Sequence, residues 1–216
     1  MPEEVLATRP EHDDTTFYLS KWCEKTLKHA QERGITIIDL VKENANKNKF
    51  DGIISKKNPK LIILNGHGNE NSVTGHKDEI LIETDSNESI LKSKIFYAVS
   101  CRSARKLGPK AIEKGALAYI GYDDDFIFVI DKNKTATPLK DDYAKLFLEP
   151  SNEVALSLIK GNCTKESYLK SQNMFKKNIQ KLLTSESPPG SENWVRYLFW
   201  DMKHQTILGD KNACFE

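Results

Sequence analysis

The chain has 216 residues, of which 38% are hydrophobic and 29% are charged. A chain of this length and composition can bury a core of its own, so we expect one domain over residues 1–216 and no long disordered segment. Its 32 Lys and Arg residues nearly cancel its 31 Asp and Glu residues, which leaves a net charge of +1 and no basic surface for nucleic acid or an anionic membrane. No apolar run reaches the roughly 18 residues of a membrane span, and the acidic start does not resemble a signal peptide, so we expect a cytoplasmic location.

The first half of the chain alternates short apolar runs with helical patterns. The apolar runs predict strands at residues 5–9, 35–40, 60–65, 94–100 and 115–122. Between them the pattern predicts helices at residues 17–33, 51–59, 86–94 and 102–115, with Thr15 or Thr16 capping the first, and hairpin segments at 72–76 and 79–85. This alternation predicts an α/β fold with a mostly parallel, twisted sheet and right-handed crossovers.

Beyond Tyr122 the pattern changes. Residues 126–130 predict one more strand, and from about residue 139 onward the chain is expected to be mostly helical. The Pro-, Gly- and Ser-rich segment 184–192 is the best candidate for a linker. The last helix, at residues 192–208, is rich in Trp and Tyr and is expected to pack on the sheet.

Two of the most apolar predicted strands end in side chains that can do chemistry together. His67 follows strand 60–65 and is flanked by Gly66 and Gly68, while Cys101 directly follows strand 94–100. The carboxyl ends of adjacent parallel strands meet at one sheet edge, where α/β folds gather their functional residues. An imidazole there can accept the proton of a thiol whose pKa is ordinarily ~8.5. The pattern therefore predicts a catalytic Cys–His dyad, with the backbone N–H groups of Gly68 and Cys101 as an oxyanion hole.

Each of these residues alone has a simpler interpretation. A buried Cys at a strand end is usually a small apolar filler, and a His in a glycine loop is usually a turn residue. A Cys and a His at the ends of two such strands rarely occur together by chance, so the catalytic dyad is the favoured interpretation.

The two blocks that carry this pair resemble a known group. The segments LIILNGHG (residues 61–68) and IFYAVSC (residues 95–101) are similar to the signature blocks of caspase-like cysteine peptidases of clan CD, and, with GYDDDF (residues 121–126), to gingipain-like peptidases and CHAT domains. The resemblance implies a three-layer α/β/α sandwich in which His67 is the general base or acid and Cys101 the nucleophile of an endopeptidase that forms an acyl-enzyme. The QACxG signature of true caspases is absent, so cleavage after Asp is not expected.

The resemblance also bears on substrate choice. Several enzymes of clan CD bind a basic P1 side chain through an acidic residue, and Asp123, Asp124 and Asp125 follow the strand expected beside the nucleophile. A partly desolvated carboxylate there would select Arg or Lys. The simpler interpretation is a solvated turn, and the sequence does not distinguish the three residues. Calcium binding is not assigned, because the spacing lacks the EF-hand loop.

The remaining histidines and cysteines are expected to be solvated or structural. His76 competes with His67 for the role of base, but it has only Gly75 beside it and no strand leading in, and His12 lies in a polar loop. No C-x-x-C pair occurs, so neither a disulfide framework nor a structural zinc site is expected. No paired ligand spacing supports a zinc site built from His67, His76, Cys101 and Cys163, and we assign no metal and no cofactor.

Three functions compete on these observations. The first is a cysteine endopeptidase acting on a protein or peptide, controlled by an activating or inhibitory protein partner. The second is a non-catalytic caspase-like interaction module that binds a peptide or protein in the same crevice. The third, a glutamine amidotransferase, is disfavoured because the G-x-C-x-G elbow is missing around Cys101.

Overall fold

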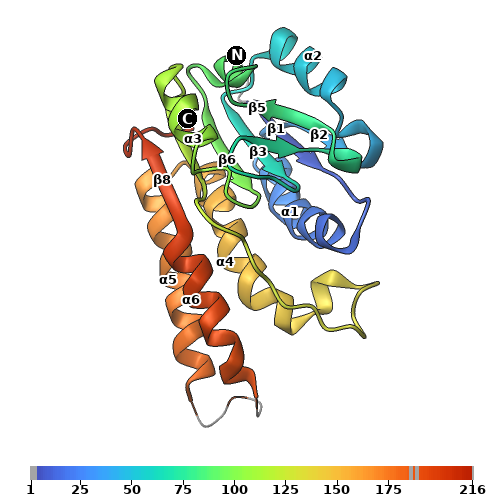
Figure 1. The fold of residues 1–216 in the computed structure, drawn as a ribbon, viewed down its shortest axis with the longest axis vertical. Helices are drawn as coiled ribbons and strands as arrows, with labels where there is room; N and C mark the ends of the chain where they lie inside the picture. The colour runs from blue at the N-terminus through green and yellow to red at the C-terminus, as the bar shows by residue number, and fades with distance from the viewer. Residues whose placement is uncertain (1–3, 185–186, 188–189, 216) are drawn as a thin grey trace.

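The computed structural model of the chain describes residues 4–184, 187 and 190–215. Its centre is a six-stranded sheet in the order β2-β1-β3-β6-β7-β8 (Figure 1). The strands are β1 (Glu4–Arg9), β2 (Thr36–Val41), β3 (Leu61–Asn65), β6 (Ile95–Val99), β7 (Ala118–Tyr122) and β8 (Gln205–Gly209). Neighbours from β2 to β7 pair in parallel, and β8 pairs antiparallel with β7. The predicted α/β architecture with a mostly parallel sheet is confirmed.

Helices cover both faces of the sheet because its central strands are apolar on both sides. Every residue of β3, β6 and β7 is buried. One face packs against α1 (Asp14–Glu32) and α4 (Asp142–Ile159). The other face packs against α2 (Lys47–Lys57), α3 (Leu107–Glu113) and the hairpin of β4 (Ser72–Thr74) and β5 (Ile80–Glu83). The result is the three-layer arrangement that continuous apolar strands require.

The C-terminal helices form a third apolar cluster. Helix α4 is followed by α5 (Thr164–Leu182) and α6 (Val195–His204), and the three helices extend past the end of the sheet (Figure 1). Phe147, Phe175, Leu182 and Leu198 are the buried residues of this cluster. Helix α6 therefore packs on α4 and α5. The prediction that the last helix packs on the sheet is wrong. The predicted final helix also ends early, at His204, because residues 205–209 pair with β7 as the edge strand β8.

Residues 126–130, predicted as a strand, are not one. The edge of β7 is already occupied by β8, so this segment has no strand to pair with. Its aromatic residues instead pack beside the sheet: the ring of Phe126 lies 4.6 Å from that of Tyr122, and the ring of Phe128 lies 6.0 Å from that of Tyr18. The alternation of apolar residues reflects this packing and not a ladder of backbone hydrogen bonds.

Other boundaries also differ from the prediction. Helix α2 begins at Lys47, because Asn46 caps it by accepting from the amide of Lys49. The helix expected at residues 86–94 is only a 3₁₀ turn over Glu88–Leu91. Part of the predicted linker 184–192 lies outside the described residues. Among the described helices, none is both long and apolar enough to cross a bilayer.

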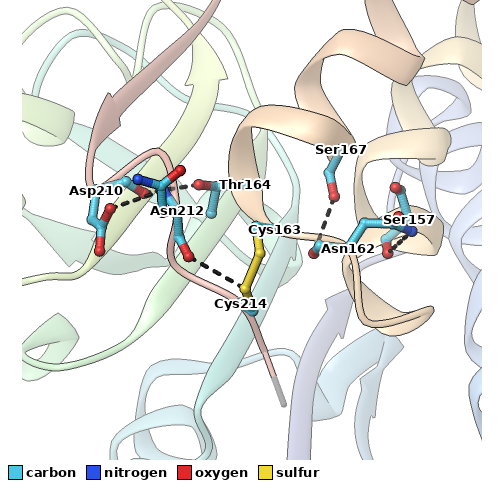
Figure 2. The surroundings of a disulfide bond; sticks show 8 residues. All are labelled: Ser157, Asn162, Cys163, Thr164, Ser167, Asp210, Asn212 and Cys214. Atoms are coloured by element: carbon cyan, nitrogen blue, oxygen red, sulfur yellow. Dashed lines mark hydrogen bonds between the residues drawn. A yellow bond between two sulfur atoms is a disulfide. The ribbon is translucent and has the colours of Figure 1, made fainter.

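The structure contains a disulfide that the sequence analysis did not expect. Cys163, at the start of α5, is bonded to Cys214 in the C-terminal tail (Figure 2). The tail reaches this position because its carbonyl groups accept hydrogen bonds from the first turn of α5, where the amide of Thr164 donates to Ala213 and that of Lys165 to Lys211. The wide spacing of the cysteines did not exclude a disulfide, because the C-terminal tail returns to the start of α5 and pairs two cysteines that are 51 residues apart.

Candidate functional site

The structure places His67 and Cys101 at the ends of neighbouring parallel strands. Asn65 of β3 pairs with Val99 of β6, and the amide of Gly66 continues the ladder by donating to the carbonyl of Val99 at 3.3 Å. Each side chain lies two residues beyond this last register pair. Both therefore lie at the carboxyl edge of the sheet, which is where parallel α/β folds place their ligands.

His67 is held by a carboxylate that the sequence analysis did not single out. Its Nε2 lies 2.6 Å from Oδ2 of Asp13, the N-cap residue of α1. Burial acts to raise the pKa of Asp13, but the hydrogen bonds from the amide of Thr16 and from His67 outweigh it, and the pKa falls to about 2. Asp13 is thus ionised at neutral pH and accepts a hydrogen from Nε2. This tautomer leaves the lone pair of His67 on Nδ1, as a general base requires.

The helix start that supplies Asp13 is well fixed. Asp13 and Thr16 form a capping box: Oδ1 of Asp13 accepts from the amide of Thr16 at 2.7 Å, and the hydroxyl of Thr16 accepts from the amide of Asp13 at 3.2 Å. Asp13 therefore caps the helix in place of the expected Thr15 or Thr16. The carboxylate of Asp13 therefore both caps the N-terminus of α1 and orients the imidazole of His67.

Cys101 is partly buried under the segment that follows β7. Its Sγ lies 3.9 Å from the carbonyl oxygen of Phe126. Burial, the largest effect, raises the pKa of this thiol above its ordinary value, the contact with Phe126 lowers it, and the negative charge of Asp125 raises it again. The thiol is therefore protonated at neutral pH in this arrangement, so a reaction at sulfur needs a base to remove the proton.

The glycines beside His67 are required by close backbone approach. A Cβ on Gly66 would lie 2.2 Å from the carbonyl oxygen of Thr74, and one on Gly68 would lie 2.9 Å from that of Ser72 and 3.0 Å from Cβ of Ser100. The hairpin β4–β5 thus presses against the His67 loop. Among the described backbone hydrogen bonds, none uses the amide of Gly68 or Cys101 as the donor.

The three acidic residues after β7 all pair with histidine or arginine side chains of this chain. Oδ1 of Asp123 lies 2.7 Å from Nδ1 of His204, and Oδ2 of Asp124 accepts from Arg105 at 3.0 Å. Oδ2 of Asp125 accepts from Arg102 at 2.6 Å. A basic substrate side chain would therefore have to replace an internal partner. Asp125 is the residue of the three whose charge acts on Cys101.

Comparisons with known proteins reveal a similarity of fold. No protein-family model matches the sequence, and no curated protein matches it. Among solved structures, the complex of the Porphyromonas gingivalis RgpB pro- and mature domains superposes with a TM-score of 0.58 at 10% sequence identity. The match covers 97% of this chain and 47% of that chain, so the present chain spans about half the length of its structural neighbour.

The fold is caspase-like. Because the two sequences are only 10% identical, the similarity concerns the arrangement of strands and helices and carries no residue roles. The caspase-like fold supports the architecture that the two short sequence blocks implied. It leaves the assignment to a particular family open.

Sequence reasoning missed Asp13 at this sheet edge, and its expectation that His12 is a solvated loop residue is wrong, because the side chain is only 12% exposed. Asp13 and His12 lie in the loop after β1, and β1 is the neighbour of β3, so this loop comes next to the His67 loop. The ring of His12 lies 5.9 Å from that of His67 in an edge-to-face arrangement. A capping pattern at Asp13-x-x-Thr16 was present in the sequence, but only the strand order shows that the cap faces His67.

Proposed function

We propose that this chain is a cysteine endopeptidase in which Cys101 is the nucleophile and His67 the general base. The observation that carries the proposal is the register of β3 and β6, which brings the two side chains to the same edge of the sheet. The hydrogen bond between Asp13 and His67 supports it, because it provides the third group that orients a catalytic imidazole. The caspase-like fold that the chain shares with the RgpB complex agrees with the proposal.

The reaction would proceed in two halves. Nδ1 of His67 accepts the proton of Cys101, and the thiolate attacks the peptide carbonyl, whose oxygen is held by the amides of Gly68 and Cys101. The resulting imidazolium then gives its proton to the leaving amine, so that the C–N bond breaks and an acyl-enzyme remains. Water, deprotonated by the same imidazole, attacks the thioester, releases the carboxylic acid and returns the proton to Cys101. Asp13 keeps the imidazole in the required tautomer and stabilises its positive charge.

The substrate would be a protein or peptide with Arg or Lys at P1. Asp125 is the proposed pocket residue, because it lies beside the nucleophile and is held by Arg102 at the surface. A substrate guanidinium can donate to Asp125 the same kind of charge-assisted hydrogen bond that Nη2 of Arg102 now donates, so a substrate Arg can replace Arg102. A protein partner that displaces Arg102 would act as an activator.

The decisive experiment combines turnover with identification of the reactive thiol. Peptidyl-Arg and peptidyl-Asp chloromethylketones are incubated with the full chain, and the labelled cysteine is identified by mass spectrometry. We expect the Arg probe to label Cys101 and the His67→Ala variant to remain unlabelled. Cys23 is the internal control: it is only 1% exposed and burial raises its pKa to about 12, so it should not react. Turnover that persists in Cys101→Ala would refute the proposal.

A non-catalytic interaction module is the second candidate. It is favoured by the raised pKa of Cys101, which is the opposite of what an isolated, activated thiol shows. Under this alternative, Cys101 would fail to react with iodoacetamide under conditions in which a control free thiol reacts. A peptide would then still bind at the sheet edge, without being cleaved.

The cytoplasmic location expected from the sequence remains a prediction. The bond between Cys163 and Cys214 is of a kind that persists mainly in oxidising compartments. Cell fractionation together with thiol-trapping of these two cysteines would decide between a cytoplasmic and an oxidising location.

A further inference from the structure

Three of the five histidines of the chain gather at the sheet edge. The ring of His12 lies 5.9 Å from the ring of His67 and 5.5 Å from the ring of His76, and both pairs are edge-to-face. They come from three separate segments: the loop after β1, the loop after β3 and the turn between β4 and β5. Only the tertiary structure brings them together.

His12 has a largely buried imidazole whose nitrogens lie near carboxylates but make no hydrogen bond. Its side chain is only 12% exposed, and neither of its ring nitrogens makes a hydrogen bond in the structure. Nδ1 of His76 is in the same situation. A buried ring nitrogen without a hydrogen bond is energetically unfavourable, and a bound ion is one arrangement that satisfies it.

A carboxylate completes a metal-binding geometry around His12. Nε2 of His12 lies 3.4 Å from Oδ1 of Asp78, and ligand atoms of His12, His67 and Asp78 all lie within 4.8 Å of one another. Two ligands of a tetrahedral zinc ion, at bond lengths near 2.05 Å, are separated by about 3.4 Å. The His12–Asp78 distance thus already fits zinc, and the ligand atom of His67 lies within 4.8 Å of the other two.

The charge around the cluster also favours a cation. The carboxylate of Asp13 lies beside the cluster, with its Oδ2 3.7 Å from Nε2 of His12. Among the residues that the structure describes, no Lys or Arg forms an ion pair with Asp13 or Asp78. Two imidazoles and one carboxylate are a donor set that zinc binds in proteins, with one tetrahedral position left for water.

We propose that His12, His67 and Asp78 bind a zinc ion, and that this ion inhibits the peptidase by occupying His67. A neutral imidazole has one nitrogen lone pair, and its other nitrogen carries hydrogen. Zinc takes that lone pair whichever nitrogen it binds, so His67 can no longer accept the proton of Cys101. The binding of zinc stands on the cluster alone, whereas the inhibition rests on the proposed function.

Binding is tested by calorimetric titration of the full chain with ZnCl₂ at neutral pH, using the Cys101→Ala variant to remove the free thiol at this edge. We expect one zinc ion per chain. His12→Ala should weaken binding at least ~10-fold, and Asp78→Asn, a change at an exposed side chain that the fold tolerates, should also weaken it. His29→Ala is the matched control, because His29 lies at the far end of α1 and pairs with Glu32.

The outcomes separate the two halves of the proposal. Absence of binding, or equal affinity in Asp78→Asn and the His29→Ala control, overturns the zinc site. Wild-type protein that binds zinc only through Cys101 also overturns it. Inhibition is tested by measuring peptide turnover with zinc added, and with Mg²⁺ added as the inert control. If zinc slows turnover no more than Mg²⁺ does, the inhibitory role is wrong. The proposed peptidase function fails on a different result, the absence of turnover in metal-free protein, and the titration can be read in either case.

Discussion

The hydrogen bond between Asp13 and His67 gives the sharpest prediction for catalysis. Asp13→Asn keeps a side-chain oxygen that can accept from the amide of Thr16, so the helix cap survives, because Asn and Asp cap helices about equally well. The amide nitrogen of Asn, however, presents hydrogens to Nε2 of His67 in place of an acceptor. This favours the tautomer in which Nδ1 carries the hydrogen and no longer acts as a base.

The size of the expected loss of kcat/KM follows from how exposed the side chains of Asp13 and His67 are. A hydrogen bond to a charged group contributes about 1.5–3 kcal/mol when it is shielded from water. His67 is 38% and Asp13 40% exposed, so screening reduces this to about 1 kcal/mol. We therefore expect kcat/KM to fall about fivefold in Asp13→Asn, and Tm to fall by about 2–4 °C, because the ionised carboxylate also stabilises the folded state. Asp13→Ala should lose the same activity and also about 1 kcal/mol of cap energy, which lowers Tm by a further ~2–4 °C.

The assay measures kcat/KM on a peptidyl-Arg fluorogenic substrate together with thermal unfolding. Asp14→Asn is the matched control, because Asp14 is the adjacent exposed carboxylate of the same helix turn. An Asp13→Asn variant with wild-type kcat/KM would refute the orienting role. An Asp13→Ala variant with wild-type Tm would show that the cap contributes nothing to stability.

The same residue predicts a pH dependence of stability. The pKa of Asp13 is about 2 in the folded protein against 3.8 as the ordinary value, so the folded state favours the ionised form. The stabilisation is complete above pH 3.8 and is lost as the pH falls towards 2. The loss of unfolding free energy over this range should be smaller in Asp13→Asn than in the wild type.

Three further predictions concern other parts of the molecule. Arg102→Gln frees Asp125 from an exposed ion pair, so kcat/KM for Arg at P1 should rise about two- to fivefold while a Leu substrate is unaffected; an equal change for both substrates would contradict the pocket. Cys163→Ser should cost about 4 kcal/mol of unfolding free energy for a loop of 51 residues, measured by urea denaturation, and reduction of the wild type should cost the same. Burial raises the pKa of Asp201 well above its ordinary value, so ionisation opposes folding as the pH rises above 3.8. Asp201→Asn should therefore be about 1–2 kcal/mol more stable than the wild type at neutral pH and equal to it at lower pH, and a less stable variant at neutral pH would contradict this.

The strands were predictable because their signal is local. Residues 61–65 and 95–99 are apolar without interruption, and only a strand covered on both faces buries so short a run completely. The alternation with helical segments then required parallel pairing. Residues 126–130 show the limit of the same reasoning, since their apolar pattern was satisfied by packing against Tyr18 and Tyr122 without a partner strand.

The pairing of residues across the chain could not be predicted in the same way. The sequence did not show that β8 would occupy the edge of β7, or that Cys214 would return to Cys163. Both depend on where the C-terminal helices direct the chain, and those helices are positioned by a cluster of side chains from α4, α5 and α6. The resemblance to caspase-like proteins was carried by two short blocks and said nothing about this region.

From the sequence alone it was possible to determine that a parallel sheet would present His67 and Cys101 at its carboxyl edge, because strand propensity and the glycines around His67 are properties of neighbouring residues. Only the tertiary structure placed Asp13 against His67, brought His12 and Asp78 to the same imidazole, and paired Asp124 and Asp125 with arginines. The physical reason is that these contacts form between loops of strands that are adjacent in the sheet and distant in the chain, and the order β2-β1-β3-β6-β7-β8 results from the packing of the whole core.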